Sequence, residues 1–370
     1  MALIYCGIDE AGYGPMLGPL CVGFSAFRIA GWKPEDGPPD LWHKLESAVC
    51  RKGRDARGRI AVADSKKLKL SNQSKTRHPL THLERGVLVF GELVSTEPEA
   101  QARILSEDSE IQRKPLDTDL ALFAALGTHL EPHDWYAGDP VLLPLGESAA
   151  QLAIARNTLA LACGAAGVEP VALACITIGE TEFNEVLRTG SNKAHLTTRC
   201  FGRYLRRVVE RWGSSRDEVR IVCDRHGGRT GYAPMIEAAV RGLEYRVRVL
   251  EETDRCSRYA LDRACSGGGI SPASVREPEA QARSPESSDQ GSIHIQFRPE
   301  AEEAHLPVAL ASMTAKLVRE LVMGRFNRYW GRRMPGLKPT AGYVQDARRW
   351  LQDVEGVLCE DEREVMVRLA

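Results

Sequence analysis

An N-terminal apolar run that ends in two adjacent acids and a glycine-rich turn constrains the fold of this chain more than any other stretch. Residues 3–8 are apolar and partly β-branched, which is typical of a buried strand, and Gly12 and Gly14 interrupt the pattern after it. Asp9 and Glu10 stand between the run and the turn. Because successive side chains of a strand point to opposite faces, both acids can reach one ligand only where the strand ends and the backbone bends.

The acid pair has two interpretations. Asp9 and Glu10 have no basic residue beside them in the sequence, so their carboxylates repel each other unless a cation lies between them. Hard divalent cations such as Mg²⁺ take oxygen ligands of this kind. The alternative is a strand followed by a solvated acidic turn, which is the commoner arrangement.

Two further stretches carry charged residues next to predicted strands. Residues 63–68, Ala-Asp-Ser-Lys-Lys-Leu, follow an apolar run and indicate a loop that enters a helix. Residues 219–224 indicate a strand that ends in Asp224, with glycines and a helix from Tyr232 after it. The carboxyl ends of strands are where α/β enzymes often bind ligands, although Asp224 also suits a helix cap.

Residues 305–330 indicate a long helix. Lys316 and Glu320 lie one turn apart on it and share a face with Ala309 and Met313. A surface ion pair is the ordinary interpretation of such spacing. The small and apolar neighbours favour partial burial instead, and a buried acid requires a partner or a cation.

The remaining patterns predict an alternation of strands and helices. Strands are predicted at residues 20–29, 86–95, 171–178, 244–251, 255–261 and 292–297, the first pairing with residues 3–8 as a hairpin. Helices are predicted at residues 118–130, 151–166 and 196–212, with two short ones within 345–369. Residues 266–292 are rich in Ser, Pro, Gly and Glu and predict a disordered insertion.

Composition narrows the function. The 370 residues carry a formal net charge of −1, so a nucleic-acid partner would require a local positive field. No apolar run is long enough to cross a bilayer and no basic, cleavable leader precedes the first strand, which predicts a cytoplasmic protein without a membrane partner. The ten cysteines are scattered and mostly lie in apolar runs, so we expect core residues in a reducing compartment.

Two motifs together resemble a known family. Asp9-Glu10-Ala11-Gly12-x-Gly14-Pro15 and Asp64-Ser65-Lys66-Lys67-Leu68, in this order, resemble the type 2 ribonucleases H, which are ribonuclease HII and its relative HIII. Residues 311–320 and the stretch 339–343, which ends in Gly-Tyr, resemble later motifs of the same family. That family cleaves RNA within RNA/DNA hybrids, or at ribonucleotides embedded in duplex DNA, with divalent metal ions.

The resemblance implies an α/β, ribonuclease H-like fold in which a mixed β-sheet is flanked by helices. The expected catalytic domain spans residues 1–340, with insertions at about 28–60 and 100–165 and a disordered loop at about 264–291. Residues 341–370 are expected to form a C-terminal helical extension. We expect the chain to act as a monomer on an RNA/DNA hybrid or on ribonucleotide-containing DNA.

The resemblance also implies a site. Four carboxylates are expected to be catalytic and to hold two Mg²⁺ or Mn²⁺ ions, namely Asp9, Glu10, Asp224 and Glu320. The expected substrate-binding residues are Gly12, Tyr13, Gly14, Ser65, Lys66, Lys67, Lys316 and Tyr343. Two-metal-ion hydrolysis would leave 5′-phosphate and 3′-hydroxyl ends. The chain departs from the family at Glu320, where aspartate is usual, and at Tyr13, where arginine or lysine is usual.

Two alternatives stay open. A catalytically degenerate homologue would bind hybrids without cutting them, and a relative of the same superfold would cut branched DNA and leave hybrids intact. A nucleotide-binding α/β enzyme is the least favoured, because no phosphate-cradling glycine motif follows a strand at the required spacing.

Overall fold

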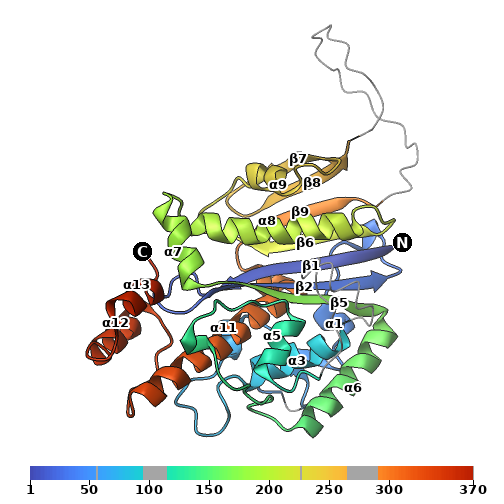
Figure 1. Ribbon diagram of the computed structural model, residues 1–370. Helices are drawn as coiled ribbons and strands as arrows, with labels where there is room; N and C mark the ends of the chain where they lie inside the picture. Colours follow the sequence, from blue (N-terminus) through green and yellow to red (C-terminus); the bar gives the residue numbers. More distant parts are fainter. Residues whose placement is uncertain (56, 95–114, 226, 265–290, 370) are drawn as a thin grey trace.

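The computed structural model describes residues 1–55, 57–94, 115–225, 227–264 and 291–369. It is an α/β structure in which helices cover both faces of a seven-stranded mixed sheet, as the sequence predicts (Figure 1). The strands follow the order β5-β2-β1-β6-β9-β8-β7 across the sheet. They are β1 (Ala2–Ala11), β2 (Leu20–Ala30), β5 (Val168–Ile178), β6 (Glu218–Asp224), β7 (Tyr245–Glu252), β8 (Ser257–Arg263) and β9 (Ile293–Arg298). A separate two-stranded sheet contains β3 (Val49–Cys50) and β4 (Ile60–Ala61).

Three neighbouring parallel strands form the centre of the large sheet. β1 is parallel to β6, with Ile8 opposite Cys223, and β6 is parallel to β9, with Asp224 opposite Arg298. The β1–β2 hairpin is antiparallel as predicted, and β5, β8 and β7 extend the sheet antiparallel at its two sides. The carboxyl ends of β1, β6 and β9 therefore lie side by side at one edge, where α/β proteins bind ligands.

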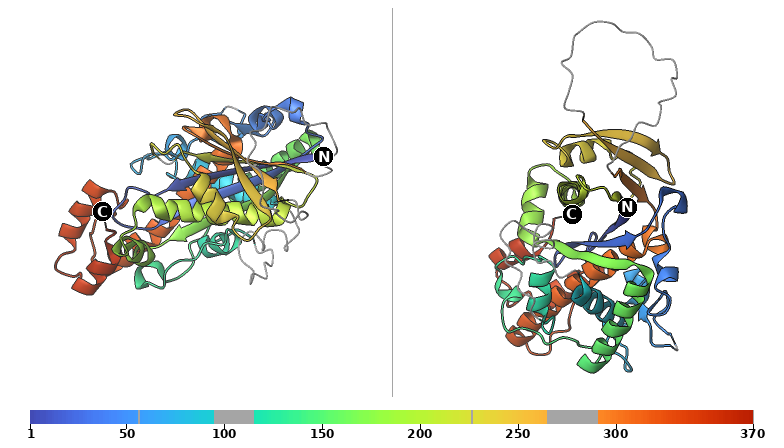
Figure 2. Two further views of the ribbon diagram at one scale, coloured as in Figure 1. Left: turned by 90° about the horizontal axis from the view of Figure 1, so that it is seen from above. Right: turned by 90° about the vertical axis from the view of Figure 1, so that its right-hand side faces the viewer.

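The helices divide between the two faces. α3, α5, α6 and α11 pack against one face and α7, α8 and α9 against the other (Figure 2). The larger helices are α3 (Thr81–Leu93), α5 (Asp119–Ala125), α6 (Ala149–Ala166), α7 (Glu180–Arg188), α8 (Lys193–Trp212), α9 (Ala233–Ala239), α11 (Leu306–Arg333), α12 (Val344–Asp353) and α13 (Glu360–Met366). Single turns form η1 (Pro34–Asp36), α1 (Leu41–Lys44), α2 (Ser65–Leu68), η2 (Asp134–Tyr136) and α10 (Ala301–Ala304).

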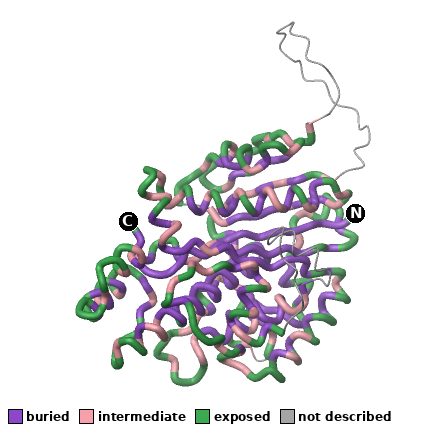
Figure 3. The backbone as a smooth tube through the Cα atoms, in the orientation of Figure 1, coloured by how far each residue is buried: buried purple, intermediate pink, exposed green. Residues whose placement is uncertain are grey.

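The continuous apolar character of the first strand follows from its central place. Leu3 and Tyr5 belong to the core beneath α11, whereas Ile4, Cys6 and Ile8 belong to the core beneath α8. A strand that is buried on both faces needs apolar residues at every position, because neither face meets water. Figure 3 shows the central strands buried along their length, between helices with exposed outer sides.

Glycines let α11 cross the first hairpin at close range. A Cβ atom on Gly7 would lie 2.1 Å from the backbone carbon of Pro307, and one on Gly23 would lie 2.1 Å from the carbonyl oxygen of Ala311. Ser25 reinforces this approach, because its hydroxyl donates to the Pro307 carbonyl over 2.7 Å. The two glycines thus fix the height of α11 above the strand that ends in the acid pair.

We expect Gly7→Ala to destabilise the protein by roughly 1–3 kcal/mol or more, because the new methyl group meets backbone that cannot rotate away. The free energy of unfolding in urea measures this. Gly324→Ala is the control. Gly324 is exposed on α11, the helix that Gly7 contacts, and a Cβ there meets no described atom within 4 Å. That variant should gain up to about 1 kcal/mol from helix propensity. Equal effects of the two changes would contradict the packing account.

One element was predicted wrongly. Residues 86–95 are predicted as a strand, but the structure has the helix α3 over Thr81–Leu93. The run is apolar because this helix is buried on nearly every side, with Gly86 against Met313 of α11. A short continuous apolar run does not separate a buried strand from a buried helix, so periodicity alone misled the assignment.

The other predicted strands and helices are present at boundaries within a few residues of those expected. The two short C-terminal helices are α12 and α13. The loop predicted to be disordered, and residues 100–114 of an expected insertion, lie outside the described residues, apart from positions 264, 291 and 292. Seven of the nine described cysteines are buried and all nine are free thiols, as expected. No helix among the described residues is long and apolar enough to cross a membrane.

Candidate active site

Acidic side chains gather where the three parallel strands end. Asp9 is buried at 8 % exposure at the end of β1, and its Oδ1 accepts the Glu10 amide over 2.8 Å. Asp224 ends the neighbouring strand β6, one register step beyond the Ile8–Cys223 pair. The predicted acids Asp9, Glu10 and Asp224 are therefore brought together by strand register.

The third parallel strand adds an acid that the sequence did not single out. After β9, Glu300 adopts a left-handed conformation with φ of 52°, and α10 starts at Ala301. The Ala301 amide donates to Asp224 Oδ1 over 3.2 Å, which holds the start of α10 against β6. Glu302 lies in this first turn, and its charge acts on Glu10. The signal in the sequence was an acid soon after a predicted strand, which is the same signal that identified Asp224.

Electrostatics tie these acids into one group. Burial raises the pKa of Asp9 well above its usual range, and the charges of Glu10 and Asp224 raise it further. Burial, followed by the charge of Asp224, raises the pKa of Glu10 to about 7. Burial also raises the pKa values of Asp224 and Glu302. The ionised group is thus held together against mutual repulsion, which is the condition that a bound cation relieves.

Two oxygens of the group lack protein partners. Glu10 Oε2 and Glu302 Oε2 are buried and have no hydrogen-bond partner among the described residues. A buried carboxylate oxygen without a donor is costly, whereas a cation would satisfy it. The candidate metal ligands of these four acids are all carboxylate oxygens, the ligand type that Mg²⁺ and Mn²⁺ prefer. The residues present therefore fit hard divalent cations.

The Asp64–Leu68 motif lies beside the acids. Asp64 caps α2 by accepting the Lys66 amide over 2.9 Å. The Ser312 hydroxyl hydrogen-bonds Asp9 and lies 3.0 Å from the buried Ser65 hydroxyl. Lys66 is exposed, and its charge lowers the pKa of Glu10 against the effects of burial and Asp224. Lys67 points elsewhere, to an ion pair with Glu303.

Two buried arginines fix the glycine-rich turn by hydrogen bonds to its carbonyl oxygens. Arg319 donates to the carbonyl oxygens of Pro19 at 3.1 Å and Leu17 at 3.2 Å. Arg368 donates to the carbonyl oxygens of Gly12 at 2.7 Å, Gly18 at 3.3 Å and Tyr13 at 3.3 Å. The chain therefore supplies positive charge to this turn from distant segments, although position 13 itself carries tyrosine.

Gly12 and Gly14 meet different surroundings in this turn. Gly12 has φ of +90°, and a Cβ there would lie 2.6 Å from the Pro19 carbonyl oxygen, so the position requires glycine. A Cβ on Gly14 would meet no described atom within 4 Å. Tyr13 between them is 42 % exposed. The turn therefore presents its outer side to solvent.

Lys316, Glu320 and Tyr343 form a neighbouring group. Glu320 lies 2.8 Å from Lys316 Nζ and 3.7 Å from Lys69 Nζ, so its carboxylate sits between two ammonium groups. Lys316 Nζ lies 5.7 Å from the ring centre of Tyr343, which is 47 % exposed. The Gly342 carbonyl accepts the Met16 amide over 2.8 Å, which joins this segment to the glycine-rich turn. The structure thus gives Glu320 basic partners, and its role as a metal ligand stays a prediction.

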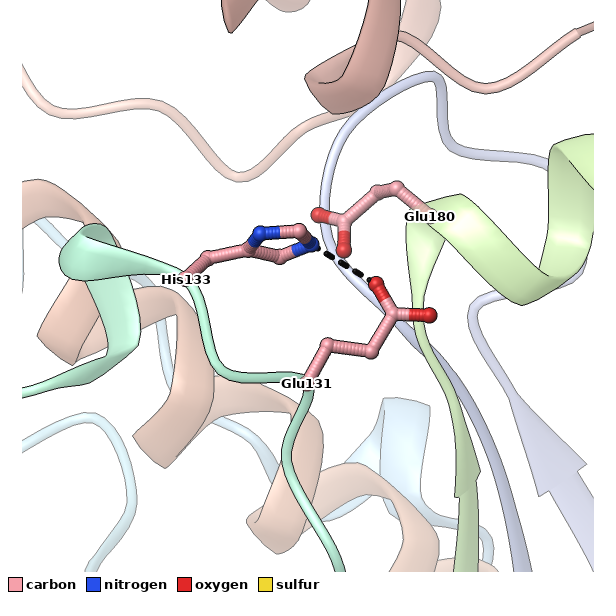
Figure 4. Close-up of side chains that lie close together, drawn as sticks. All are labelled: Glu131, His133 and Glu180. Atoms are coloured by element: carbon pink, nitrogen blue, oxygen red, sulfur yellow. Dashed lines mark hydrogen bonds and ion pairs between the residues drawn. The ribbon is translucent and has the colours of Figure 1, made fainter.

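A second cluster lies just after the end of β5, next to the glycine-rich turn. Among the described residues, Glu131, His133 and Glu180 bring three candidate ligand atoms within 4.8 Å of one another (Figure 4). Among the described residues, this is the one group of three or more such side chains whose candidate ligand atoms all lie this close together, and the sequence did not suggest it. In the described part of the chain, no three acids at the strand ends have ligand atoms that all lie within 4.8 Å of one another. Carboxylates that share two ions a few ångströms apart span more room than ligands of one ion.

We expect Mg²⁺ to raise the melting temperature more at about pH 8 than at about pH 5.5. Because folding raises the pKa of Glu10 from its ordinary value of 4.5 to about 7, the folded chain binds more protons, and stability falls as the pH rises through that interval. At about pH 5.5, which is below the raised pKa of Glu10, this carboxyl is largely protonated, so a cation gains less by binding than at about pH 8. Thermal scans with Mg²⁺ or EDTA at the two pH values measure the difference, and an equal shift at both would contradict this account.

No protein-family model matches the chain, and no curated protein matches it in sequence. Similar solved structures include a chain of the PCNA:RNase HII complex from Archaeoglobus fulgidus, with 11 % identity, a TM-score of 0.38 and coverage of 99 % of this chain and 94 % of that one. Ribonuclease H2 from Pyrococcus horikoshii OT3 shows 14 % identity and a TM-score of 0.40, with coverage of 98 % and 97 %. RNase H3 from Aquifex aeolicus shows 14 % identity and a TM-score of 0.33, with coverage of 98 % and 71 %. TM-scores below 0.5 at such identities establish neither the family nor the activity of this chain. Both have to be inferred from the chain's own residues.

Proposed function

We propose that this protein is a divalent-metal-dependent endoribonuclease that cleaves RNA in RNA/DNA hybrids or at ribonucleotides embedded in duplex DNA. The observation that carries the proposal is the gathering of Asp9, Glu10, Asp224 and Glu302 at the carboxyl ends of three parallel strands. Charges within this group raise the pKa values of Asp9, Glu10 and Glu302, and two buried oxygens have no hydrogen-bond donor among the described residues. Cations bound among them would remove both costs.

The four carboxylates have one task in this proposal, which is to hold two Mg²⁺ or Mn²⁺ ions against a scissile phosphate. Asp9 is suited to the central place, because the charges of Glu10 and Asp224 both act on it. When bound, the ions would activate a water for in-line attack and stabilise the leaving 3′ oxygen, which gives 5′-phosphate and 3′-hydroxyl ends. Glu302 takes the fourth place here instead of Glu320, whose carboxylate lies between two lysines.

The neighbouring residues suit a nucleic-acid backbone. Lys66 is exposed and acts on the acids, so it can hold a phosphate as a point charge. Tyr343 presents an exposed ring beside Lys316 and the glycine-rich turn, which suits packing on a sugar. We assign the backbone of residues 12–14 to contact with the ribose 2′-hydroxyl, a role that does not require a basic side chain at Tyr13.

One set of reactions tests the proposal. The purified full chain is incubated with Mg²⁺ or Mn²⁺ and offered an RNA/DNA hybrid, a DNA duplex with one ribonucleotide, and plain duplex DNA. We expect cleavage of one or both ribonucleotide-containing substrates, with 3′-hydroxyl ends and no cleavage in EDTA. Tight hybrid binding without cleavage in either metal would favour the degenerate homologue. Cleavage of branched DNA with hybrids left intact would favour a junction nuclease, and either result would overturn the proposal.

A further inference from the structure

The Glu131–His133–Glu180 cluster joins the segment between α5 and η2 to the start of α7. Glu131 and His133 lie between α5 and η2, and Glu180 is the first residue of α7. Their ligand atoms lie within 4.8 Å of one another, and Figure 4 shows the Glu180 carboxylate pointing into the space between the His133 ring and the Glu131 carboxylate. One imidazole nitrogen and two carboxylate oxygens thus converge on one point.

Glu180 carries the observation that points to a ligand. The residue is fully buried, at 0 % exposure. Its Oε1 accepts the Gly18 amide over 3.0 Å and the Tyr136 hydroxyl over 2.5 Å. Its Oε2 is buried and has no hydrogen-bond partner among the described residues. An ion pair between Glu131 and His133 accounts for two members of the cluster but leaves this oxygen unexplained, whereas a cation satisfies all three residues.

The ligands are held in place before any ion arrives. The Glu131 carboxylate accepts the amides of Thr181 over 3.1 Å and Glu182 over 2.9 Å, at the start of α7. The His133 ring stacks on Trp135 with ring centres 4.4 Å apart. A Cβ on Gly179 would lie 2.2 Å from the Glu131 carboxyl carbon, so the close approach requires glycine there. Packing, backbone donors and a glycine therefore pre-organise two of the three ligands.

We propose that Glu131, His133 and Glu180 form a structural site for a divalent transition-metal ion, with Zn²⁺ as the ion best suited to it. A histidine nitrogen with two carboxylate oxygens is a ligand set that zinc accepts, with a water completing the tetrahedron. The imidazole distinguishes this site from the all-oxygen acids at the strand ends, which suit Mg²⁺ or Mn²⁺. The two sites should therefore select different ions.

The place of the site suggests what the ion would do. Glu180 holds the amide of Gly18, which belongs to the same turn as Gly12 and Gly14, and His133 Nε2 lies 3.1 Å from Thr181 Oγ1. An ion here would fasten the 131–136 segment to α7 and, through Glu180, to the far end of the glycine-rich turn. Its role is to hold this corner of the fold together.

Zinc binding by the full chain tests the site. The metal-free protein is equilibrated with limiting free Zn²⁺ in an excess of Mg²⁺, which fills the all-oxygen positions, and bound zinc is counted by elemental analysis. The wild type should hold one more zinc equivalent than His133→Gln, with an affinity loss of at least about tenfold, since even outer partners of metal ligands have effects of that size. His129→Gln is the matched control, because His129 is exposed in the same segment.

A second arm separates metal binding from folding. Glu131→Gln should lose the same zinc equivalent, whereas Glu185→Gln, on the exposed side of α7, should keep it. Zinc should raise the melting temperature of the wild type and of the His129→Gln control, but not of His133→Gln. Anomalous diffraction from zinc-soaked wild-type crystals gives a readout that needs no variant to fold, and its peak should lie between the three ligands. Equal zinc content of wild type and His133→Gln, or a peak elsewhere, would overturn the site.

The zinc site does not rest on the nuclease proposal. Asp9→Asn and Asp224→Asn remove ligands at the strand ends, and both variants should keep the zinc equivalent. A protein that binds zinc at His133 but cuts no hybrid would reject the nuclease assignment alone. A protein that cuts hybrids but shows no zinc difference would reject this site alone.

Discussion

Asp9→Asn should abolish hybrid cleavage and, without metal, make the protein more stable. The amide keeps the shape of the carboxyl group and can still accept the Glu10 amide, but it carries no charge for a cation. Metal ions supply several kcal/mol of transition-state stabilisation and each 1.36 kcal/mol is a factor of ten, so we expect a rate loss of at least about 1,000-fold. Single-turnover cleavage of the preferred substrate in Mg²⁺ measures it.

The gain in stability has the same cause. Burial, with the charges of Glu10 and Asp224, raises the pKa of Asp9. At a pH above the ordinary pKa of aspartate, ionisation of Asp9 therefore lowers the stability of the folded state. Removing the charge should add roughly 1–3 kcal/mol to the free energy of unfolding in EDTA at about pH 8. Asp361→Asn, at an exposed position of α13, is the control and should stay within about 0.5 kcal/mol of wild type. A variant that keeps cleaving, or that loses both activity and stability, would contradict the assignment of Asp9.

Glu302→Gln should lower cleavage far more than Glu320→Gln. Glu302 lies among the acids and has a buried oxygen with no donor in the described part of the chain. Its loss should cost at least about 100-fold in rate and raise the Mg²⁺ concentration needed for half-maximal rate. Glu320 neutralises Lys316 and Lys69, so its loss should change the rate by less than about tenfold, mainly by altering how these lysines meet phosphates.

The two variants are matched, because both replace a partly exposed helical glutamate with its amide. Single-turnover rates across a range of Mg²⁺ concentrations separate a lost ion ligand from a lost substrate contact. The opposite ranking, with Glu320→Gln the more severe, would return the fourth ligand position to Glu320.

Local pattern was enough to predict the strands that end in Asp9 and Asp224. Apolar runs broken by glycines specify buried strands, and right-handed α/β connections bring their carboxyl ends to one edge. The strand at residues 292–297 was predicted as well, but the acid after it was overlooked. Glu320 was proposed instead because residues 311–320 resemble the helix that carries the fourth carboxylate in the type 2 ribonucleases H. The position of a residue in a helix predicts which face its side chain lies on, but not which side chains of other elements contact it. Lys69 could therefore not be predicted as a partner of Glu320.

Other features had no local signal. Arg368 contacts Gly12 and Tyr13 across more than 350 residues. No sequence pattern near Arg368 or near the glycine-rich turn predicts this contact. Nor does the sequence indicate that Glu131 and Glu180, from separate elements, meet around one histidine. The helix α3 was mistaken for a strand because tertiary burial, and not amphipathic spacing, determined its composition.

The hold of Arg368 on the glycine-rich turn bears on the order of events during biosynthesis. The guanidinium that bonds the Gly12 carbonyl is translated 356 residues after that glycine. Contacts of such long sequence separation form slowly, because a large loop must close before they gain anything. A nascent chain can therefore assemble the hairpin of β1 and β2 long before that turn is locked. Any catalytic competence that depends on the turn would be acquired only after Arg368 has left the ribosome.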